Sequence, residues 1–188
     1  MRPTLRPLPL AALLLLPLAG CMEQSQELLP IPASIKSSSV VRQVEVAVRP
    51  GALAKVAALD EQAKARNRSD PSGLPFAEMM PRVIADVTRA WGLTGGRELK
   101  LLIEIDAIET AGTAATLFGG SRDRMAGSVF IRDPTTGEPL GQLYVDVVNS
   151  HSGPVGLLIR GGGIREELAE EFAIHIARAL TGRRDRPR

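Results

Sequence analysis

Three stretches of the chain alternate between apolar and polar or small residues, and a fourth is rich in strand-forming residues. The clearest alternation is in residues 98–106, where leucine or isoleucine occupies every second position. A period of two buries one face of a strand and leaves the other face in water. Residues 40–48 and 140–148 repeat the pattern with valines, and residues 127–132 have strand composition. The sequence therefore predicts four β-strands.

Two further stretches carry apolar residues one helical turn apart, so each predicts a helix with one buried face. The first stripe is Phe76, Met80, Val83, Ile84, Val87 and Trp91, and the second is Ile164, Leu168, Phe172, Ile176 and Leu180. Pro81 removes a backbone hydrogen bond inside the first stripe, so that helix either begins near Met80 or kinks there. Gly92 and Gly182 suit the two C-terminal caps. Residues 52–66 predict a weaker helix.

The predicted elements occur in the order strand, weak helix, helix, three strands and helix. Consecutive strands with short connections favour an antiparallel sheet, and residues 133–137, Asp-Pro-Thr-Thr-Gly, have the composition of a tight turn between two of them. We therefore predict an α+β fold, a two-layer sandwich with a mainly antiparallel sheet of about four strands and two helices on one face. The predicted single domain covers residues 40–182.

The first residues of the chain have the pattern of an export signal. Arg2 and Arg6 precede an apolar run from about Leu8 to Leu18, which is shorter than the roughly 20 apolar residues that span a bilayer. A basic start, a short apolar core and small residues at its end are typical of a secretory signal peptide. We assign residues 1–20 to this peptide.

Leu18-Ala19-Gly20-Cys21 ends the apolar run and resembles the lipobox of bacterial lipoproteins. The resemblance implies that Cys21 receives a diacylglycerol, that the chain is cleaved before it, and that the new amino group is acylated. Several acyl chains on one residue anchor a protein durably, because each buried methylene contributes roughly 0.8 kcal/mol. Residues 21–39 are rich in proline, serine and glutamine and show no period, so we predict a lipid-anchored flexible tether there.

The residue after the cysteine is Met22. In the lipoproteins of two-membrane bacteria, an aspartate at this position favours retention in the inner membrane. The resemblance therefore implies that the lipid is held in the outer membrane and that the domain lies on its periplasmic face.

Removal of the signal peptide changes the charge of the protein. The chain of 188 residues has 23 Lys and Arg against 21 Asp and Glu, and loss of Arg2 and Arg6 balances the two. The basic tail, residues 183–188, keeps four arginines, so the rest of the domain is slightly acidic. We therefore predict no nucleic-acid partner. Cys21 is the single cysteine, so a hydrophobic core must supply the stability of the domain.

Residues with catalytic or metal-binding chemistry are few. His151 and His175 are the two histidines and no ligand cluster surrounds them, so we predict no metal or other cofactor. His175 borders an apolar stripe, which favours a structural role, and Ser121 has no nucleophile motif around it. Glu104 and Asp106 share the wet face of one strand, so an envelope hydrolase that uses them is an alternative. The main prediction is a protein that is not an enzyme.

Apolar residues in a glycine-rich loop are the strongest signal for an interaction. Residues 154–159 place them in the predicted loop 149–163, and a second loop is predicted at residues 107–127. An exposed apolar patch of this kind marks a partner or membrane contact, and the alternative is that the loop folds back over the sheet. The predicted partner-binding residues are Val155, Leu157, Leu158, Ile159 and Arg160.

The region 40–182 as a whole resembles uncharacterised proteobacterial envelope lipoproteins of α+β type. The resemblance lies in a valine-rich strand and a helix, then residues 99–105, a hairpin at 130–137 and a helix at 166–172. Related lipoproteins are accessories in envelope transport and secretion. The resemblance thus implies a non-catalytic binding or assembly accessory with an envelope protein as partner. A lipid or small-molecule carrier is the remaining alternative and would need an apolar cavity between helices and sheet.

Overall fold

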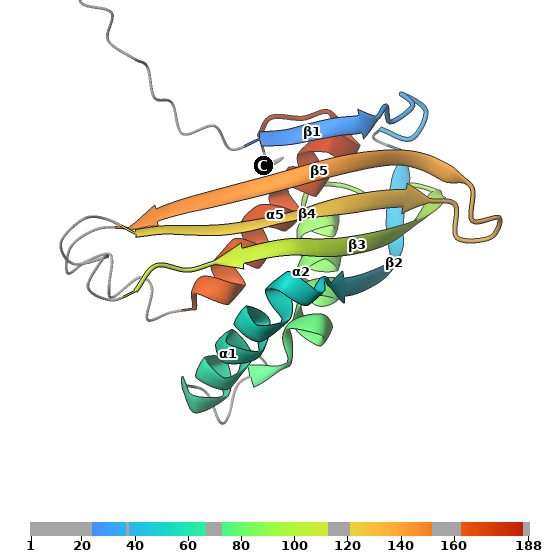
Figure 1. The fold of residues 1–188 in the computed structure, drawn as a ribbon. Helices are drawn as coiled ribbons and strands as arrows, with labels where there is room; N and C mark the ends of the chain where they lie inside the picture. Colours follow the sequence, from blue (N-terminus) through green and yellow to red (C-terminus); the bar gives the residue numbers. More distant parts are fainter. Residues whose placement is uncertain (1–23, 37, 67–72, 113–120, 152–162, 186–188) are drawn as a thin grey trace, which may run out of the picture.

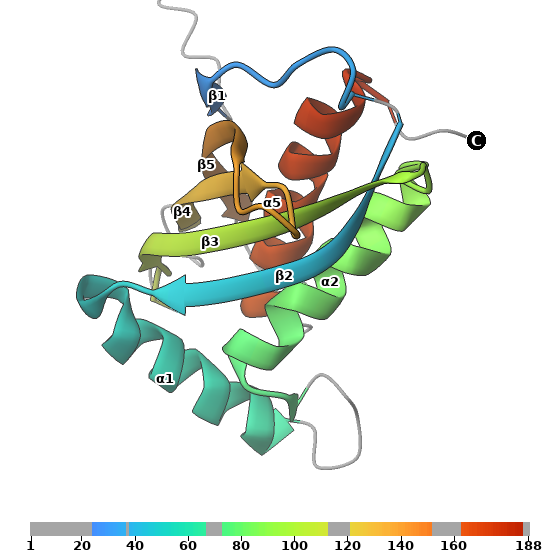
Figure 2. The same ribbon diagram turned by 90° about the vertical axis from the view of Figure 1, so that its right-hand side faces the viewer.

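The structure is a computed structural model that describes residues 24–36, 38–66, 73–112, 121–151 and 163–185. These residues form the two-layer α+β fold that the sequence predicts (Figure 1). A five-stranded sheet makes one layer, and two long helices that cover one of its faces make the other (Figure 2). Within the described ranges, no helix is both long and apolar enough to cross a bilayer.

The sheet has the strand order β1-β5-β4-β3-β2 (Figure 1). Its strands are β1 (Gln24–Leu29), β2 (Ser39–Val48), β3 (Arg97–Glu109), β4 (Ser121–Arg132) and β5 (Pro139–His151). The β1–β5, β5–β4 and β4–β3 pairs are antiparallel, whereas β2 pairs with β3 in parallel. A parallel pair needs a connection that returns to the same end of the sheet, and this connection contains two of the helices.

The helices are α1 (Pro50–Arg66), α2 (Phe76–Ala90) and α5 (Ile164–Thr181). α2 and α5 lie side by side on the same face of the sheet (Figure 2). They run in the same direction, because Arg165 at the start of α5 contacts Leu74 just before α2, and Arg178 near the end of α5 lies over Trp91 just after α2. α1 lies past the end of β2 and contacts β3.

The hydrophobic core lies between the sheet and the helix pair. The alternation predicted for the strands is confirmed by burial, since every second residue faces the core: Leu99, Leu101, Ile103 and Ile105 in β3, and Leu143, Val145 and Val147 in β5. Both predicted helical stripes contribute to the same core, with Phe76, Met80 and Ile84 from α2, and Leu168, Phe172, Ile176 and Leu180 from α5.

The predicted ends of the two stripes are partly confirmed. Gly92 and Gly182 follow their helices with φ values of 86° and 66°, as the cap prediction requires. α2 already begins at Phe76 and contains Pro81, so a helix start near Met80 is wrong. The apolar pattern of α1 is weak because half of its buried positions are alanines. These positions are Ala52, Val56, Leu59 and Ala63.

The turn between β4 and β5 confirms the prediction for residues 133–137. Asp133 Oδ1 accepts hydrogen bonds from the backbone N–H of Thr135 at 2.9 Å and of Thr136 at 3.0 Å. The bonds from Thr136 and Thr135 lower the pKa of Asp133. Gly137 has a φ of 73°, a left-handed conformation that glycine adopts without strain.

The prediction of a flexible tether over residues 21–39 is wrong for the residues that the structure describes. Gln24–Leu29 form β1, which adds an edge strand to the sheet. After β1, Ile31 and Ile35 are buried in the core, and Gly141 permits this approach because a Cβ there would lie 2.8 Å from Ile31 Cγ1. β1 pairs through its backbone and leaves its side chains exposed, so no apolar alternation marks it.

The two predicted loops are shorter than expected. For residues 107–127, β3 continues to Glu109 and β4 already begins at Ser121. For residues 149–163, β5 continues to His151. At the ends of β3 and β4, the charged Glu109 and Arg124 form an ion pair between the strands, so a hydrophobicity pattern does not mark them as strand residues.

Candidate functional site

The residues predicted for lipidation and partner binding lie outside the described residues. These are Cys21, and Val155, Leu157, Leu158, Ile159 and Arg160. The sheet nevertheless shows where their segments begin and end. Because Ser121 pairs with His151, the segments 113–120 and 152–162 leave the sheet at the same end. The segment 113–120 therefore ends next to the start of the segment 152–162, which contains the predicted partner-binding residues.

The two carboxylates considered for hydrolysis belong to an ion cluster on the uncovered face of the sheet. The backbone N–H of Arg49 donates to Ile105 O at 2.9 Å, which continues the β2–β3 pairing and places the Arg49 side chain beside β3. Its guanidinium forms ion pairs with Glu104 and with Asp106, the latter at 2.9 Å between Nε and Oδ1. The hydrogen bond to Glu104, then the charges of Glu104 and Asp106, raise the pKa of Arg49.

A second ion cluster lies on the same face, toward the end of the sheet where the two predicted loops start. Arg124 of β4 donates to Asp146 of β5 in a two-pronged geometry, with Nε–Oδ1 at 2.8 Å and Nη2–Oδ2 at 2.7 Å. Its Nη1 also donates to Glu109 of β3 at 3.2 Å. The bond to Asp146 raises the pKa of Arg124 most. These contacts explain why charged residues occupy strand positions here.

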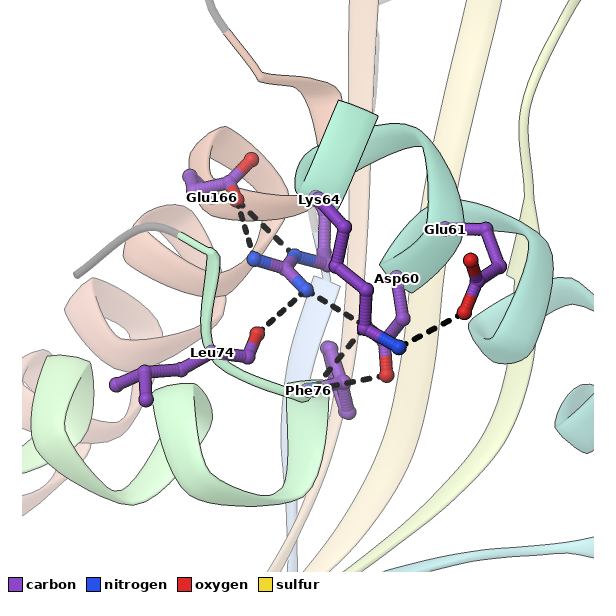
Figure 3. Close-up of polar contacts among 7 residues, drawn as sticks. Asp60, Glu61, Lys64, Leu74, Phe76 and Glu166 are labelled. Atoms are coloured by element: carbon purple, nitrogen blue, oxygen red, sulfur yellow. Dashed lines mark hydrogen bonds and ion pairs between the residues drawn. The ribbon is translucent and has the colours of Figure 1, made fainter. Parts of the chain in front are cut away.

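A buried arginine, Arg165, joins the three helices at one point, and Figure 3 labels the residues Asp60, Leu74 and Glu166 that it contacts. Arg165, in the first turn of α5, has only 1% of its side chain exposed. Its Nη1 lies 2.6 Å from Asp60 Oδ1 and donates to Leu74 O at 2.8 Å. Its Nη2 and Nε donate to Glu166 Oε1 at 2.6 and 3.0 Å. One guanidinium thus connects α1, the segment that leads into α2, and α5.

Asp60 has a second task at this junction. Pro75 precedes α2, and its side chain has no atom that can accept a hydrogen bond from the first turn of the helix. Asp60 Oδ1 and Oδ2 instead both lie 3.1 Å from the backbone N–H of Phe76. A carboxylate from α1 therefore caps the positive end of α2. The sequence pattern does not indicate this junction, although Arg165 stands three residues before Leu168, a residue of the apolar stripe of α5.

Histidine chemistry adds no site to these clusters. His175 is buried in α5, and His151 is the last residue of β5. Among the residues that the structure describes, no group of three or more His, Cys, Asp and Glu residues is placed to hold a metal ion.

Two hollows meet at the C-terminal ends of α2 and α5. The helix groove has a volume of about 400 Å³ and is lined by Asp86, Val87, Ala90, Trp91, Glu170, Glu171, Ile174, Arg178, Arg184 and Asp185. The basic pocket has a volume of about 520 Å³ and is lined by Ser25, Glu27, Lys36, Leu143, Arg178, Ala179, Gly182, Arg183 and Arg184. Arg178 and Arg184 line both hollows, and the Arg178 guanidinium lies 5.8 Å from the centre of the Trp91 ring.

The basic pocket lies between β1 and the last turn of α5. Ser25 and Glu27 lie two residues apart on β1 and so share one face of the strand, and Arg178 and Gly182 come from the end of α5. Lys36 Nζ donates to Glu27 Oε1 at 2.8 Å, and this bond lowers the pKa of Glu27. Arg183 and Arg184 belong to the tail predicted from the sequence. The pocket itself leaves no sequence pattern, because its walls come from segments that are far apart in the chain.

Comparisons with known proteins find matches among solved structures. No family model matches the chain, and no curated protein matches its sequence. The PelC dodecamer from Paraburkholderia phytofirmans is 11% identical with a TM-score of 0.44, over 79% of this chain and 96% of that chain. A minor lipoprotein from Acinetobacter baumannii is 10% identical with a TM-score of 0.35, over 74% and 92%. A protein from Xanthomonas campestris is 13% identical with a TM-score of 0.43, over 80% and 89%.

Proposed function

We propose that this chain is a lipoprotein held by acyl chains on Cys21 at the periplasmic face of the outer membrane. Its domain acts there as a non-catalytic binding or assembly accessory in envelope transport or secretion. The observation that carries the proposal is the lipobox-like Leu18-Ala19-Gly20-Cys21 at the end of a short apolar run. The start of β1 at Gln24 supports it, because three residues span at most about 11 Å and so keep the domain next to the anchor.

The ion cluster around Arg49 favours a binding role over the hydrolase alternative. A pair of catalytic carboxyl groups needs one acid that holds a proton and one free carboxylate. Here one guanidinium forms ion pairs with both Glu104 and Asp106, so both carboxylates already have a structural partner. The packed core argues against the carrier alternative, which needs an apolar cavity between helices and sheet. Phe172, Ile176 and other buried side chains fill the space between α5 and the sheet.

Lipid attachment is tested by expressing the full chain in a two-membrane bacterium that is fed an alkyne analogue of palmitate. We expect the wild type to be labelled and the Cys21→Ser variant to be unlabelled and released from the membrane fraction. Cys21 is the single cysteine, so no other thiol can take the label. An unlabelled wild type, or a Cys21→Ser variant that stays with the membranes, would contradict the proposal.

Met22→Asp should move the protein to the inner-membrane fraction on a density gradient.

The accessory role is tested by crosslinking and pull-down of the acylated protein. Serine at Val155, Leu157, Leu158 and Ile159 should remove envelope partners that the wild type captures, because apolar contact area is lost. The matched control is Leu28→Ser with Leu53→Ser, since both leucines are large exposed apolar residues outside this segment. A partner set that is unchanged in the first variant, or lost equally in both, would count against a binding role for residues 155–159.

A further inference from the structure

We propose that the basic pocket binds the phosphate of an anionic phospholipid headgroup and thereby fixes the orientation of the domain on its membrane. The charges of the pocket carry the argument. Lys36 and Glu27 pair with each other, which leaves Arg178, Arg183 and Arg184 as three uncompensated cations. In the part of the chain that the structure describes, none of these three guanidinium groups has a carboxylate within ion-pair distance.

The donors of the pocket are suited to phosphate oxygens. A guanidinium presents several N–H groups in a fixed fork, which matches the oxygens of a phosphate. Arg178 is held in place by the Trp91 ring, and its buried Nε has no acceptor among the described residues. Ser25 adds a hydroxyl from the opposite wall. The pocket is therefore formed by donors from two separate elements of the fold and has one buried donor free.

The surrounding charges do not cancel this preference. The C-terminal end of α5 carries roughly half a negative charge, which is small beside three arginines. The nearby acids Asp86, Glu170, Glu171 and Asp185 line the helix groove and not the basic pocket. An anion is therefore attracted to the β1 side of Arg178 and repelled from the α2 side.

The position of the pocket identifies a lipid headgroup as the ligand. Ser25 stands on the pocket wall and is four residues after Cys21, so the pocket lies at most about 14 Å of extended chain from the proposed anchor. This step depends on the proposed function, since it assumes the lipid on Cys21. An anchored domain would meet anionic headgroups at high local concentration, as two linked binding sites do. The lipid anchor would then supply attachment and the pocket would supply orientation.

The test uses the unacylated chain from residue 21 onward with Cys21→Ser, which keeps every residue that the structure describes. Sedimentation measures its binding to vesicles of phosphatidylcholine alone or mixed in equal parts with phosphatidylglycerol. We expect binding to the mixed vesicles only. Arg183→Gln combined with Arg184→Gln should weaken it on the order of 30-fold, since each basic residue near an anionic surface contributes roughly five-fold. Both residues are exposed, so the far-ultraviolet circular dichroism should not change.

The matched control is Arg82→Gln with Arg97→Gln, which removes the same charge from exposed positions on α2 and β3. It should bind almost as well as the wild type. Equal losses in the two double variants, or no preference for the mixed vesicles, would overturn the proposal. So would saturable binding of inorganic phosphate without binding to mixed vesicles, because the ligand would then be free phosphate. Since the chain used is unacylated, these outcomes are independent of whether palmitate labels Cys21.

Discussion

Replacing Arg165 by alanine is expected to lower the free energy of unfolding by about 3–5 kcal/mol. The guanidinium is the only cation that the structure shows in contact with Asp60, whose side chain is 17% exposed, and it also donates to the backbone oxygen of Leu74. Its removal leaves a largely buried carboxylate without its counter-charge and a carbonyl without its donor. Uncompensated groups of this kind cost more than the ion pair itself contributes. Urea unfolding followed by circular dichroism measures the change.

The matched control is Arg89→Ala. Arg89 Nη1 lies 2.9 Å from Asp86 Oδ1, yet its side chain is 67% exposed. An exposed pair of this type is worth about 0.2–1 kcal/mol. The double-mutant cycle with Asp60→Ala separates the pairwise interaction from the loss of the α2 cap, because Asp60 also accepts from Phe76 N. If Arg165→Ala costs no more than Arg89→Ala, the junction is not a buried ion network.

The junction also connects stability with the proposed binding function. Arg165 comes three residues after the segment 152–162, which contains the predicted partner-binding residues, and it fixes the start of α5 against α1 and α2. A loop whose ends are held rigidly loses less entropy on binding than one whose ends move. We therefore expect loss of Arg165 to weaken partner capture as well as the fold.

The elements whose apolar residues recur at the spacing of a strand or a helix could be predicted from the sequence. β3, β5, α2 and α5 each place apolar residues on one face, and that face determines both the element and its side of the sheet. The turn at 133–137 was predictable because its determinants are local. Asp133 accepts the hydrogen bonds of the turn, and Gly137 adopts its positive φ, all within five residues.

The features that the sequence did not predict depend on partners that are distant in the chain. β1 has exposed side chains and is defined by its backbone pairing with β5. The alternation of apolar and polar residues in β2 and β3 does not show that the two strands pair in parallel. The first half of β4 contains Arg122, Asp123 and Arg124, which suggests a loop until folding brings the Asp146 carboxylate to the Arg124 guanidinium. The basic pocket is a similar case, because Ser25 and Arg184 meet only after folding.

Replacing Phe172 by alanine is expected to lower the free energy of unfolding by about 3–5 kcal/mol. Phe172 is fully buried and belongs to the core between α5 and the sheet, so its removal leaves a cavity that rigid strands cannot close. The control is Leu53→Ala on α1, whose side chain is 51% exposed and should change stability by less than about 0.5 kcal/mol. Urea unfolding of both variants measures the difference. Equal losses of unfolding free energy in the two variants would mean that α1 is covered in solution by something else, such as a second copy or a partner. A small loss for Phe172→Ala would mean that α5 does not cover the sheet.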